Sequence, residues 1–156
     1  MTNIDPAYLS EQKRKELEAE LLNLKMVERK NIAGQLEYAK SLGDLSENAE
    51  YHEARDKQAD IEDRIADLEV MLKNAVIISG SATKDKVVVG SKVLIQKAGG
   101  DKIEYQIVGS EEANAAMGKI SHQSPLGSAL LNKKKSDKVL VSTPKGDVQY
   151  SIVDIK

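Results

Sequence analysis

The apolar positions in the first half of the chain are arranged symmetrically about a short polar stretch near residue 46. On both sides of it, apolar residues recur every three or four positions, as on one face of an α-helix. When these residues are matched across the stretch, their numbers sum to 92 or 93 in five pairs: Leu17 with Ala75, Leu21 with Leu72, Leu24 with Leu68, Val27 with Ile65, and Ile32 with Ile61. A constant sum is typical of two antiparallel helices joined by a tight turn, so the pattern predicts a helical hairpin.

The arms of this hairpin are predicted over residues 10–41 and 46–74. Gly43 suits the left-handed residue that ends a helix, and Asp44 or Ser46 suits the N-cap of the second arm. Each arm of about 30 residues is ~45 Å long. The apolar face of each arm becomes polar toward the turn. On the first arm Glu28 interrupts this face, and on the second arm the same face continues through Gln58, Ala54, Tyr51 and Glu47. We therefore expect aliphatic packing at the base of the hairpin and a solvated tip.

After Ala75 the apolar pattern changes to alternation, which predicts a domain boundary between residues 76 and 77. Two turns, 98–101 and 144–147, are rich in Gly, Pro and Asp, and Ser124 followed by Pro125 favours the start of a short helix that ends at Leu131. Strands are expected at about 75–79, 87–96, 102–108, 138–143 and 147–155. The predicted fold class is α+β: a coiled-coil hairpin (1–76) followed by a small antiparallel sheet with one helix (77–156).

Composition narrows the classes of protein to which the chain can belong. Hydrophobic residues make up 40% of 156 residues, with no Phe, no Trp and five Tyr, so the core must be aliphatic. The sequence has no run long enough to span a membrane and no signal-peptide layout near its beginning. It has no cysteine, which excludes disulfides and thiolate metal sites. We therefore expect a cytoplasmic protein without a membrane partner.

Charge is divided unequally between the two halves. Residues 1–75 carry 11 basic and 17 acidic side chains, a net of −6, whereas residues 76–156 carry 12 and 8, a net of +4. Phosphate contacts supply most nonspecific affinity for duplex DNA. An acidic hairpin is unsuited to that role, so any contact with nucleic acid is expected to be local.

Two carboxylates, Asp44 and Glu47, lie three residues apart at the predicted tip. One interpretation is a capping box that stabilises the start of the second arm by about 1 kcal/mol. The other is half of a metal site, because magnesium is commonly held by one or two carboxylates while water, substrate or another protein completes its octahedron. Spacing alone favours the capping box.

The tip sequence Gly-Asp-Leu-Ser-Glu-Asn-Ala-Glu-Tyr at residues 43–51 resembles the signature of the bacterial Gre transcript cleavage factors. The similarity continues along the second arm at Arg55, Gln58, Ile61, Glu62, Arg64 and Ile65. It implies a transcription elongation factor whose hairpin enters the secondary channel of RNA polymerase. There Asp44 and Glu47 are expected to help hold a magnesium ion and its water, so that the polymerase cleaves backtracked RNA and arrested complexes are rescued.

The resemblance also implies an RNA contact near the tip. Lys40 and Arg55 match positions that lie where the displaced 3′ segment of the nascent RNA passes, and Lys57 and Lys30 are weaker candidates. A solvated surface role is the alternative for any of these basic residues. Lys30, Asp60 and Glu53 depart from the family pattern, which has proline at the first position and an apolar or aromatic residue at the second. These departures put the strength of cleavage in question.

The second half resembles the C-terminal domain of the same family, which has the fold of FK506-binding prolyl isomerases and binds the rim of the polymerase channel. The matching segments are 89–91, 107–109, 120–121, 124–127 and 129–131. Ser121, Ser124 and Pro125 are the expected polymerase-binding residues, although capping and turn roles also explain them. Isomerase activity is not expected, because that pocket is lined by aromatic residues and this half offers only Tyr105 and Tyr150.

Two other functions stay open: a channel-binding inhibitor of RNA polymerase that does not promote cleavage, and a coiled-coil adaptor or chaperone unrelated to transcription. A self-sufficient enzyme is not expected. The two histidines, His52 and His122, do not have the spacing of a metal site, and no catalytic triad or phosphate-binding loop is evident. The sequence leaves the oligomeric state undetermined, with a monomer as the expectation.

Overall fold

The structure, a computed structural model, describes residues 5–78 and 84–156. It divides into two compact units: a helical unit of residues 14–74, and a sheet unit that combines the described residues up to 13 with those from 75 onward. The α+β class is confirmed. The sequence placed the whole of residues 1–76 in the hairpin, whereas residues 5–13 belong to the sheet unit.

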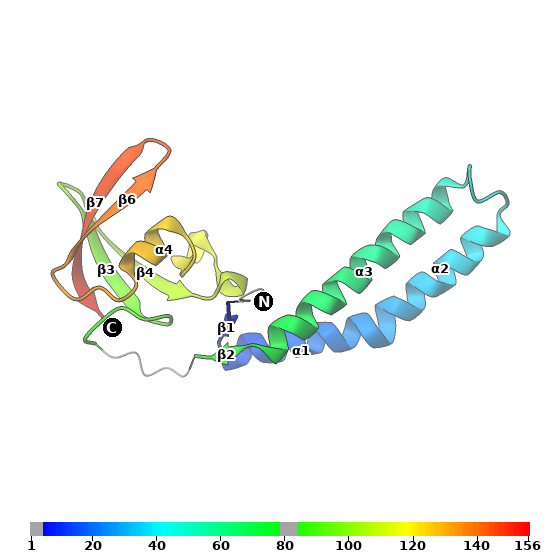
Figure 1. The fold of residues 1–156 in the computed structure, drawn as a ribbon, viewed down its shortest axis with the longest axis horizontal. Helices are drawn as coiled ribbons and strands as arrows, with labels where there is room; N and C mark the ends of the chain where they lie inside the picture. Colours follow the sequence, from blue (N-terminus) through cyan, green and yellow to red (C-terminus); the bar gives the residue numbers. More distant parts are fainter. Residues whose placement is uncertain (1–4, 79–83) are drawn as a thin grey trace. The chain divides into compact units, whose positions relative to one another are not determined.

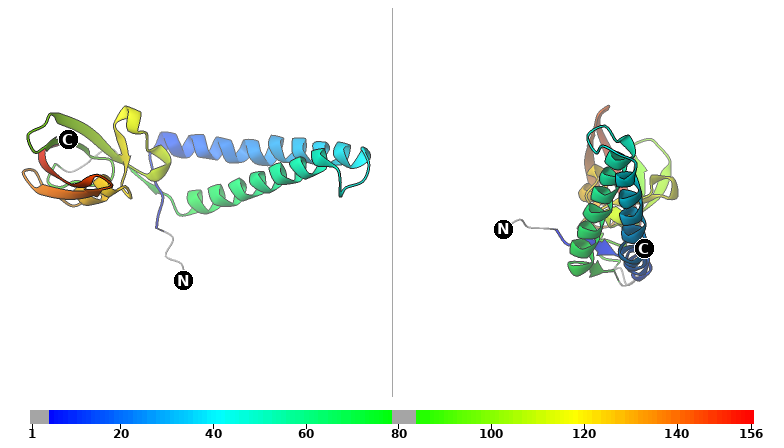
Figure 2. Two further views of the ribbon diagram at one scale, coloured as in Figure 1. Left: turned by 90° about the horizontal axis from the view of Figure 1, so that it is seen from above. Right: turned by 90° about the vertical axis from the view of Figure 1, so that its right-hand side faces the viewer.

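The helical unit is the predicted antiparallel hairpin. Its first arm consists of α1 (Glu11–Asn23), a π-helical turn (Leu24–Glu28) and α2 (Arg29–Ser41). Its second arm is α3 (Ala49–Lys73), which runs beside α2 (Figures 1 and 2). The loop between the arms covers residues 42–48, so the second arm begins three residues later than the sequence predicted.

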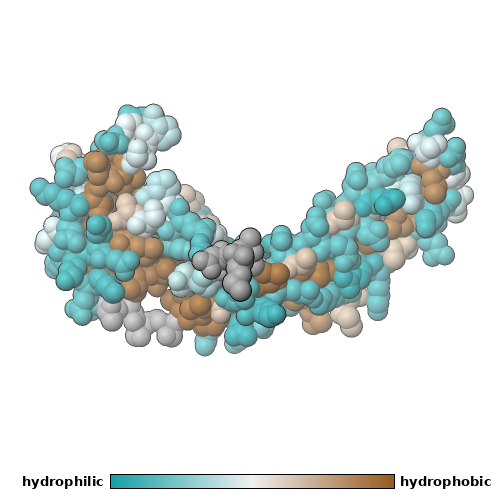
Figure 3. Space-filling view, viewed as in Figure 1, coloured by the Kyte–Doolittle hydropathy of each residue, from teal (hydrophilic) through white to brown (hydrophobic). Residues whose placement is uncertain are grey.

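An aliphatic seam holds the two arms together. On α3 the buried or half-buried positions alternate in steps of four and three: Ala54, Gln58, Ile61, Ile65, Leu68 and Leu72. The first arm contributes buried Leu17, Ile32 and Ala39. This spacing is that of a coiled-coil seam, in which 3.5 residues per turn keep the apolar face toward the partner. The space-filling view shows hydrophobic patches between hydrophilic surface along the arms (Figure 3).

The π-helical turn corrects one predicted pair. On the first arm the seam positions Leu24, Glu28 and Ile32 are separated by two successive steps of four residues. The seam of α3 alternates steps of four and three, so the first arm has one extra residue over the same length. A π turn accommodates one extra residue, and the backbone N–H of Arg29 donates to the carbonyl of Leu24, five residues earlier. Val27 is consequently 45% exposed and does not pack as the partner of Ile65. That predicted pair is wrong, and Glu28 occupies the half-buried position instead.

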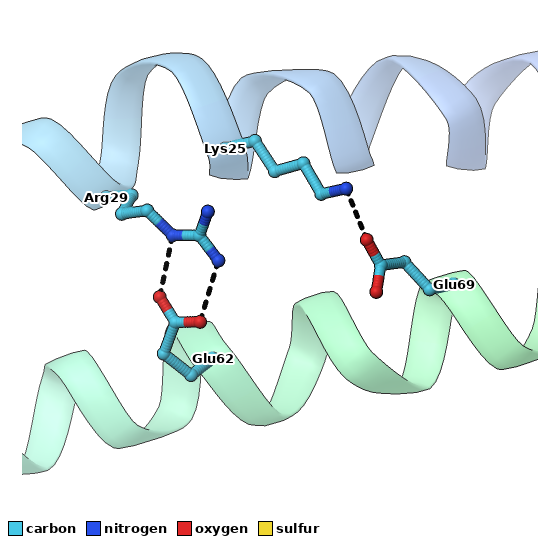
Figure 4. A network of polar contacts seen from close by, with 4 residues as sticks. All are labelled: Lys25, Arg29, Glu62 and Glu69. Atoms are coloured by element: carbon cyan, nitrogen blue, oxygen red, sulfur yellow. Dashed lines mark hydrogen bonds and ion pairs between the residues drawn. The ribbon is translucent and has the colours of Figure 1, made fainter.

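Ion pairs across the arms lie along the edges of the seam (Figure 4). Nε and Nη2 of Arg29 each lie 2.7 Å from a carboxylate oxygen of Glu62, and Lys25 pairs with Glu69. The hydrogen bond from Arg29 lowers the pKa of Glu62, and that of Arg29 is raised by the same contact. Because these side chains are exposed, water screens each pair and its contribution to stability is small. The pairs join the two arms at matching heights along the hairpin.

The sheet unit contains a five-stranded sheet in the order β5-β4-β3-β7-β6. Its strands are β3 (Lys92–Lys97), β4 (Lys102–Val108), β5 (Lys119–Ser121), β6 (Lys138–Thr143) and β7 (Gly146–Ile155), with α4 (Pro125–Leu130) packed on one face. The core is aliphatic, as composition required: Val87, Val93, Ile95, Ile107, Leu130, Val139, Val141, Ile152 and Ile155. Tyr105 and Tyr150 pack against this core.

Two features of the sheet differ from the prediction. The strand expected from residue 87 begins at Lys92, because Gly90 has φ of +101° and the buried Ser91 side chain accepts a hydrogen bond from the Val88 N–H. The short strand β5 was not predicted, and it pairs with β4 in parallel, so the sheet is not purely antiparallel. A three-residue strand is too short to show alternation. The predicted end of the first strand, residue 79, lies outside the described residues.

A short strand near the beginning of the chain, β1 (Tyr8–Leu9), pairs in parallel with β2 (Val76–Ile77). Leu9 is fully buried, and a Cβ on Gly109 would lie 1.8 Å from the Tyr8 carbonyl oxygen, so the strand packs closely against that loop. Ser10 then donates from both N and Oγ to the Glu112 carboxylate, at 3.0 and 2.6 Å. These contacts place residues 8–10 in the sheet unit.

Among the helices of residues 5–78 and 84–156, none combines the length and the apolar composition that crossing a membrane requires.

The register shift gives a direct test in the pair Ile65→Ala and Val27→Ala. Ile65 is 3% exposed, so its truncation should lower the free energy of unfolding by about 2 to 5 kcal/mol. Val27→Ala should change it by less than about 0.5 kcal/mol. Urea unfolding followed by circular dichroism measures both, and equal losses would show that Val27 packs in the seam after all.

Candidate functional site at the hairpin tip

The tip loop, residues 42–48, leaves the first arm through a tight reversal. The N–H of Leu42 still donates to Ala39 O, and Gly43 has φ of +130°, which confirms the left-handed position predicted for it. Every residue from Ser41 to Glu47 is exposed. The loop lies beyond the ends of α2 and α3 (Figure 2), and its side chains are open to solvent.

Asp44 is held in one orientation by an Asx turn. Its Oδ1 accepts hydrogen bonds from both the backbone N–H and the Oγ of Ser46, each at 3.0 Å. These bonds, that from the backbone first, hold the pKa of Asp44 below its ordinary value of 3.8. The carboxylate is thus ionised at neutral pH. Within the described residues its second oxygen, Oδ2, accepts no hydrogen bond.

Asn48 is the N-cap of α3, a role that the sequence assigned to Asp44 or Ser46. Its Oδ1 accepts from the Tyr51 N–H at 3.1 Å, while its Nδ2 donates to Ala39 O on the opposite arm at 2.6 Å. The capping-box interpretation of Asp44 and Glu47 is therefore wrong. Asparagine is a strong N-cap residue, so its position directly before Ala49 was a usable signal. The bond across the arms has no signature in the sequence.

Glu47 precedes this cap and is exposed. Within the part of the chain that the structure describes, its carboxylate accepts no hydrogen bond and forms no ion pair. Asn48 performs the capping, so the fold does not use the charge of Glu47. Together with Asp44, the loop offers two carboxylates that local structure leaves available to an outside ligand.

The donor set fits half of a magnesium site. Carboxylate oxygens are the ligands that this ion prefers, and it commonly takes one or two of them together with water and substrate. Residues 5–78 and 84–156 contain no group of three or more acidic or imidazole side chains that could hold a metal. Asp44 and Glu47 could therefore share an ion with other ligands but could not enclose it.

The basic residues near the tip differ in their availability. Lys40 and Arg55 are exposed, and neither forms an ion pair with another described residue. Lys57, by contrast, lies 2.8 Å from Glu53, and this contact lowers the pKa of Glu53. The extra acid that departs from the family pattern is thus paired with a basic neighbour at the surface.

The predicted polymerase-binding residues lie in the sheet unit. Ser124 caps α4: its Oγ donates to Ser121 O at 2.6 Å and accepts from the Gly127 N–H at 3.0 Å. Ser121 Oγ lies 2.9 Å from Ser110 Oγ and accepts from the Gln123 N–H. Pro125, at the first position of α4, is exposed. The two serines therefore shape this segment, and Pro125 is the one exposed to solvent.

Asn48 variants test the link between the arms. Asn48→Ala removes both hydrogen bonds and should lower the free energy of unfolding by about 1 to 2 kcal/mol. Asn48→Asp keeps the acceptor for Tyr51 but loses the donor to Ala39, so its loss should be intermediate. Urea unfolding and amide exchange at Tyr51 measure the effect. Wild-type stability in the aspartate variant would show that the bond across the arms contributes nothing.

Ser46→Ala tests the Asx turn. The variant loses the hydroxyl donor, so the pKa of Asp44 should rise toward 3.8 while staying below it, because the Ser46 N–H still donates. Carboxyl NMR titration measures the change. The pKa of Glu53, which Lys57 lowers, should not move. An unchanged or lowered Asp44 pKa would contradict the role of the hydroxyl.

Comparison with known proteins identifies the family. The family model "Transcription elongation factor, N-terminal" matches residues 7–77, and "Transcription elongation factor, GreA/GreB, C-term" matches residues 82–156. Transcription elongation factor GreA of Clostridium acetobutylicum is 50% identical over 144 residues, 91% of each chain. That of Thermoanaerobacter pseudethanolicus is 45% identical, covering 97% of this chain and 98% of its own.

Among solved structures, GreA factor homolog 1 (Gfh1) of Thermus thermophilus is 27% identical, with a TM-score of 0.44 over 97% of this chain and 99% of its own. The family models and the sequence identities decide the assignment. The chain belongs to the GreA/GreB family of transcription elongation factors.

Proposed function

We propose that this chain acts on RNA polymerase by entering its secondary channel tip first and bringing Asp44 and Glu47 to the catalytic centre. It is a transcription elongation factor that stimulates transcript cleavage, and it is an accessory factor rather than an enzyme on its own. The observation that supports this mechanism is the tip loop itself. It presents the Glu47 carboxylate and the Oδ2 oxygen of Asp44 without hydrogen-bond partners among the described residues, and Asp44 is ionised and already oriented.

The role of the two acids follows from their chemistry. A magnesium ion bound there would lower the pKa of a coordinated water and stabilise charge on the cleaved phosphate. Asp44 Oδ2 and the Glu47 carboxylate would hold the ion from the side of the factor, and the polymerase would supply the remaining protein ligands. Because Ser46 fixes Asp44 in advance, little ordering remains at the moment of binding.

Lys40 and Arg55 are proposed to contact the displaced 3′ segment of the nascent RNA. Both are exposed near the tip, and neither is committed to an ion pair among the described residues. A basic side chain that neutralises a phosphate adds affinity without reading sequence. This fits a factor that acts wherever the polymerase has backtracked.

The segment around α4 is proposed to bind the rim of the channel. Pro125 offers an exposed apolar surface, while the hydroxyls of Ser121 and Ser124 hold the backbone that displays it. One copy of the chain supplies every group named here, so we propose that it acts as a monomer.

The double variant Asp44→Asn with Glu47→Gln tests the mechanism. An asparagine carbonyl oxygen still accepts from Ser46, so the tip should keep its shape while both charges are lost. RNA cleavage in stalled polymerase complexes should fall by about 100-fold or more, since even indirect support of a metal is worth 10- to 100-fold. Gel analysis of labelled transcripts measures the rate, with polymerase binding measured in parallel.

The outcomes separate this mechanism from the two alternatives. Full cleavage by the double variant would eliminate the role of the acids. Slowed elongation without shortened RNA from the unmodified chain would indicate an inhibitor instead. Absence of polymerase binding would point to an unrelated coiled-coil adaptor.

A further inference from the structure

A small pocket lies between the arms just below the tip loop. It has a volume of about 180 Å³ and is lined by Gln35, Tyr38, Ala39, Glu50, Glu53, Ala54 and Lys57. All of these residues belong to α2 or α3. Neither tip acid lines it, nor do Lys40 and Arg55, and Lys57, a weaker candidate for RNA contact, is paired with Glu53. The proposed function therefore gives the pocket no role.

The pocket exists because the seam residues at this height are small. Ala39 and Ala54, the last buried residues of the two arms before the tip, are 2% and 5% exposed. Further down, buried seam positions hold larger aliphatic residues such as Ile32, Ile65 and Leu68. Two alanines leave the space between the helices unfilled and form an apolar floor. Longer side chains on either side make the walls.

The walls combine an aromatic ring with negative charge. Tyr38 is 64% exposed, so much of its ring is open to solvent at the wall of the pocket. Glu50 forms no ion pair among the described residues. Glu53 is ionised, with its pKa lowered by Lys57, and the Lys57 ammonium is committed to it. The pocket therefore carries net negative charge beside an exposed π face.

The geometry of the hairpin separates this pocket from the proposed RNA contacts. Tyr38 and Glu53 each precede a seam alanine, whereas Lys40 and Arg55 each follow one. Successive helical residues are turned by about 100°, and an antiparallel pair keeps equivalent positions on the same side of its seam. The acidic, aromatic side is thus opposite to the basic side. A polyanion following Lys40 and Arg55 would not enter the pocket.

We propose that the pocket binds one arginine side chain of RNA polymerase when the hairpin occupies the channel. A guanidinium stacks on an aromatic face and pairs with carboxylates through its planar fork, which Tyr38 and Glu50 would supply together. The volume is below the ~300 to 1,000 Å³ of sites for small molecules and suits a single long side chain. This proposal rests on the proposed function, because it requires the hairpin to enter the channel.

Binding to RNA polymerase without nucleic acid tests the proposal. Tyr38→Ala and Glu50→Gln should each raise the Kd of the labelled chain by about 5- to 30-fold. Tyr38→Phe keeps the ring and should stay within about twofold of the unmodified chain. The exposed side chains permit these changes without unfolding, which circular dichroism verifies. Unchanged affinity in the alanine and glutamine variants would overturn the proposal.

Cleavage at saturating concentration separates this proposal from the proposed function. With the polymerase fully bound, Tyr38→Ala should cleave at close to the unmodified rate, because Asp44 and Glu47 are intact. The double variant of the tip acids should show the opposite pattern, with normal affinity and lost cleavage. Loss of cleavage at saturation in Tyr38→Ala would instead assign Tyr38 to the reaction and contradict an affinity role.

A photo-crosslinker identifies the occupant. Benzophenone carried at position 38 should couple to a polymerase peptide that contains arginine, as read by mass spectrometry. Coupling to the transcript would show that Tyr38 stacks on a nucleobase and would overturn the proposal. Coupling only to segments without arginine would do the same.

Discussion

The hydrogen bond from Asn48 Nδ2 to Ala39 O is the contact on which the tip depends. The seam that joins the arms ends at Ala39 and Ala54, so apolar packing cannot hold the last turns together. One amide side chain replaces it: Asn48 caps α3 with its oxygen and ties that helix to α2 with its nitrogen. Asn48 therefore caps the helix without using either acid, although Asp44 Oδ1 still shapes the loop through its bonds from Ser46. Asp44 Oδ2 and the Glu47 carboxylate stay open to an outside ligand.

The small size of the seam residues near the tip has two consequences. Small residues near the tip reduce the aliphatic burial that stabilises the arms there, and stability must come from the lower hairpin, where Ile65 and Leu68 are buried and Arg29 and Lys25 pair across the arms (Figure 4). They also open the pocket beside Tyr38. The tip loop itself is exposed throughout, and its Leu42 and Leu45 present apolar side chains to solvent beside the two acids.

The sequence predicted the hairpin well because the mirror pattern is long and reflects burial on one helix face. The prediction failed where the local backbone conformation decides the structure. Val27 was wrongly paired with Ile65 because the π turn adds one residue to the first arm. Apolar spacings of three or four residues do not show whether a π turn accommodates such an extra residue. The strands β1 and β5 were missed because two or three residues show no alternation, and β1 is fixed by distant contacts such as that of the Tyr8 carbonyl with Gly109. At the site, the identity of the acids came from the resemblance, and Asn48 could have been read as the N-cap. The Asx turn and the hydrogen bond from Asn48 across the arms have no signature in the sequence.

The two acids are not equally prepared for a metal. Asp44 has one oxygen held by two donors from Ser46, so its rotamer is already selected. Glu47 has no such partner in the described chain, and ordering a glutamate side chain costs up to about 2 kcal/mol. Most of the entropy lost on coordination therefore falls on Glu47. A site with one fixed and one mobile carboxylate binds an ion weakly by itself, and it gains strength only where other ligands are already in place. That asymmetry suits a factor whose charge should act inside the polymerase and not in free solution.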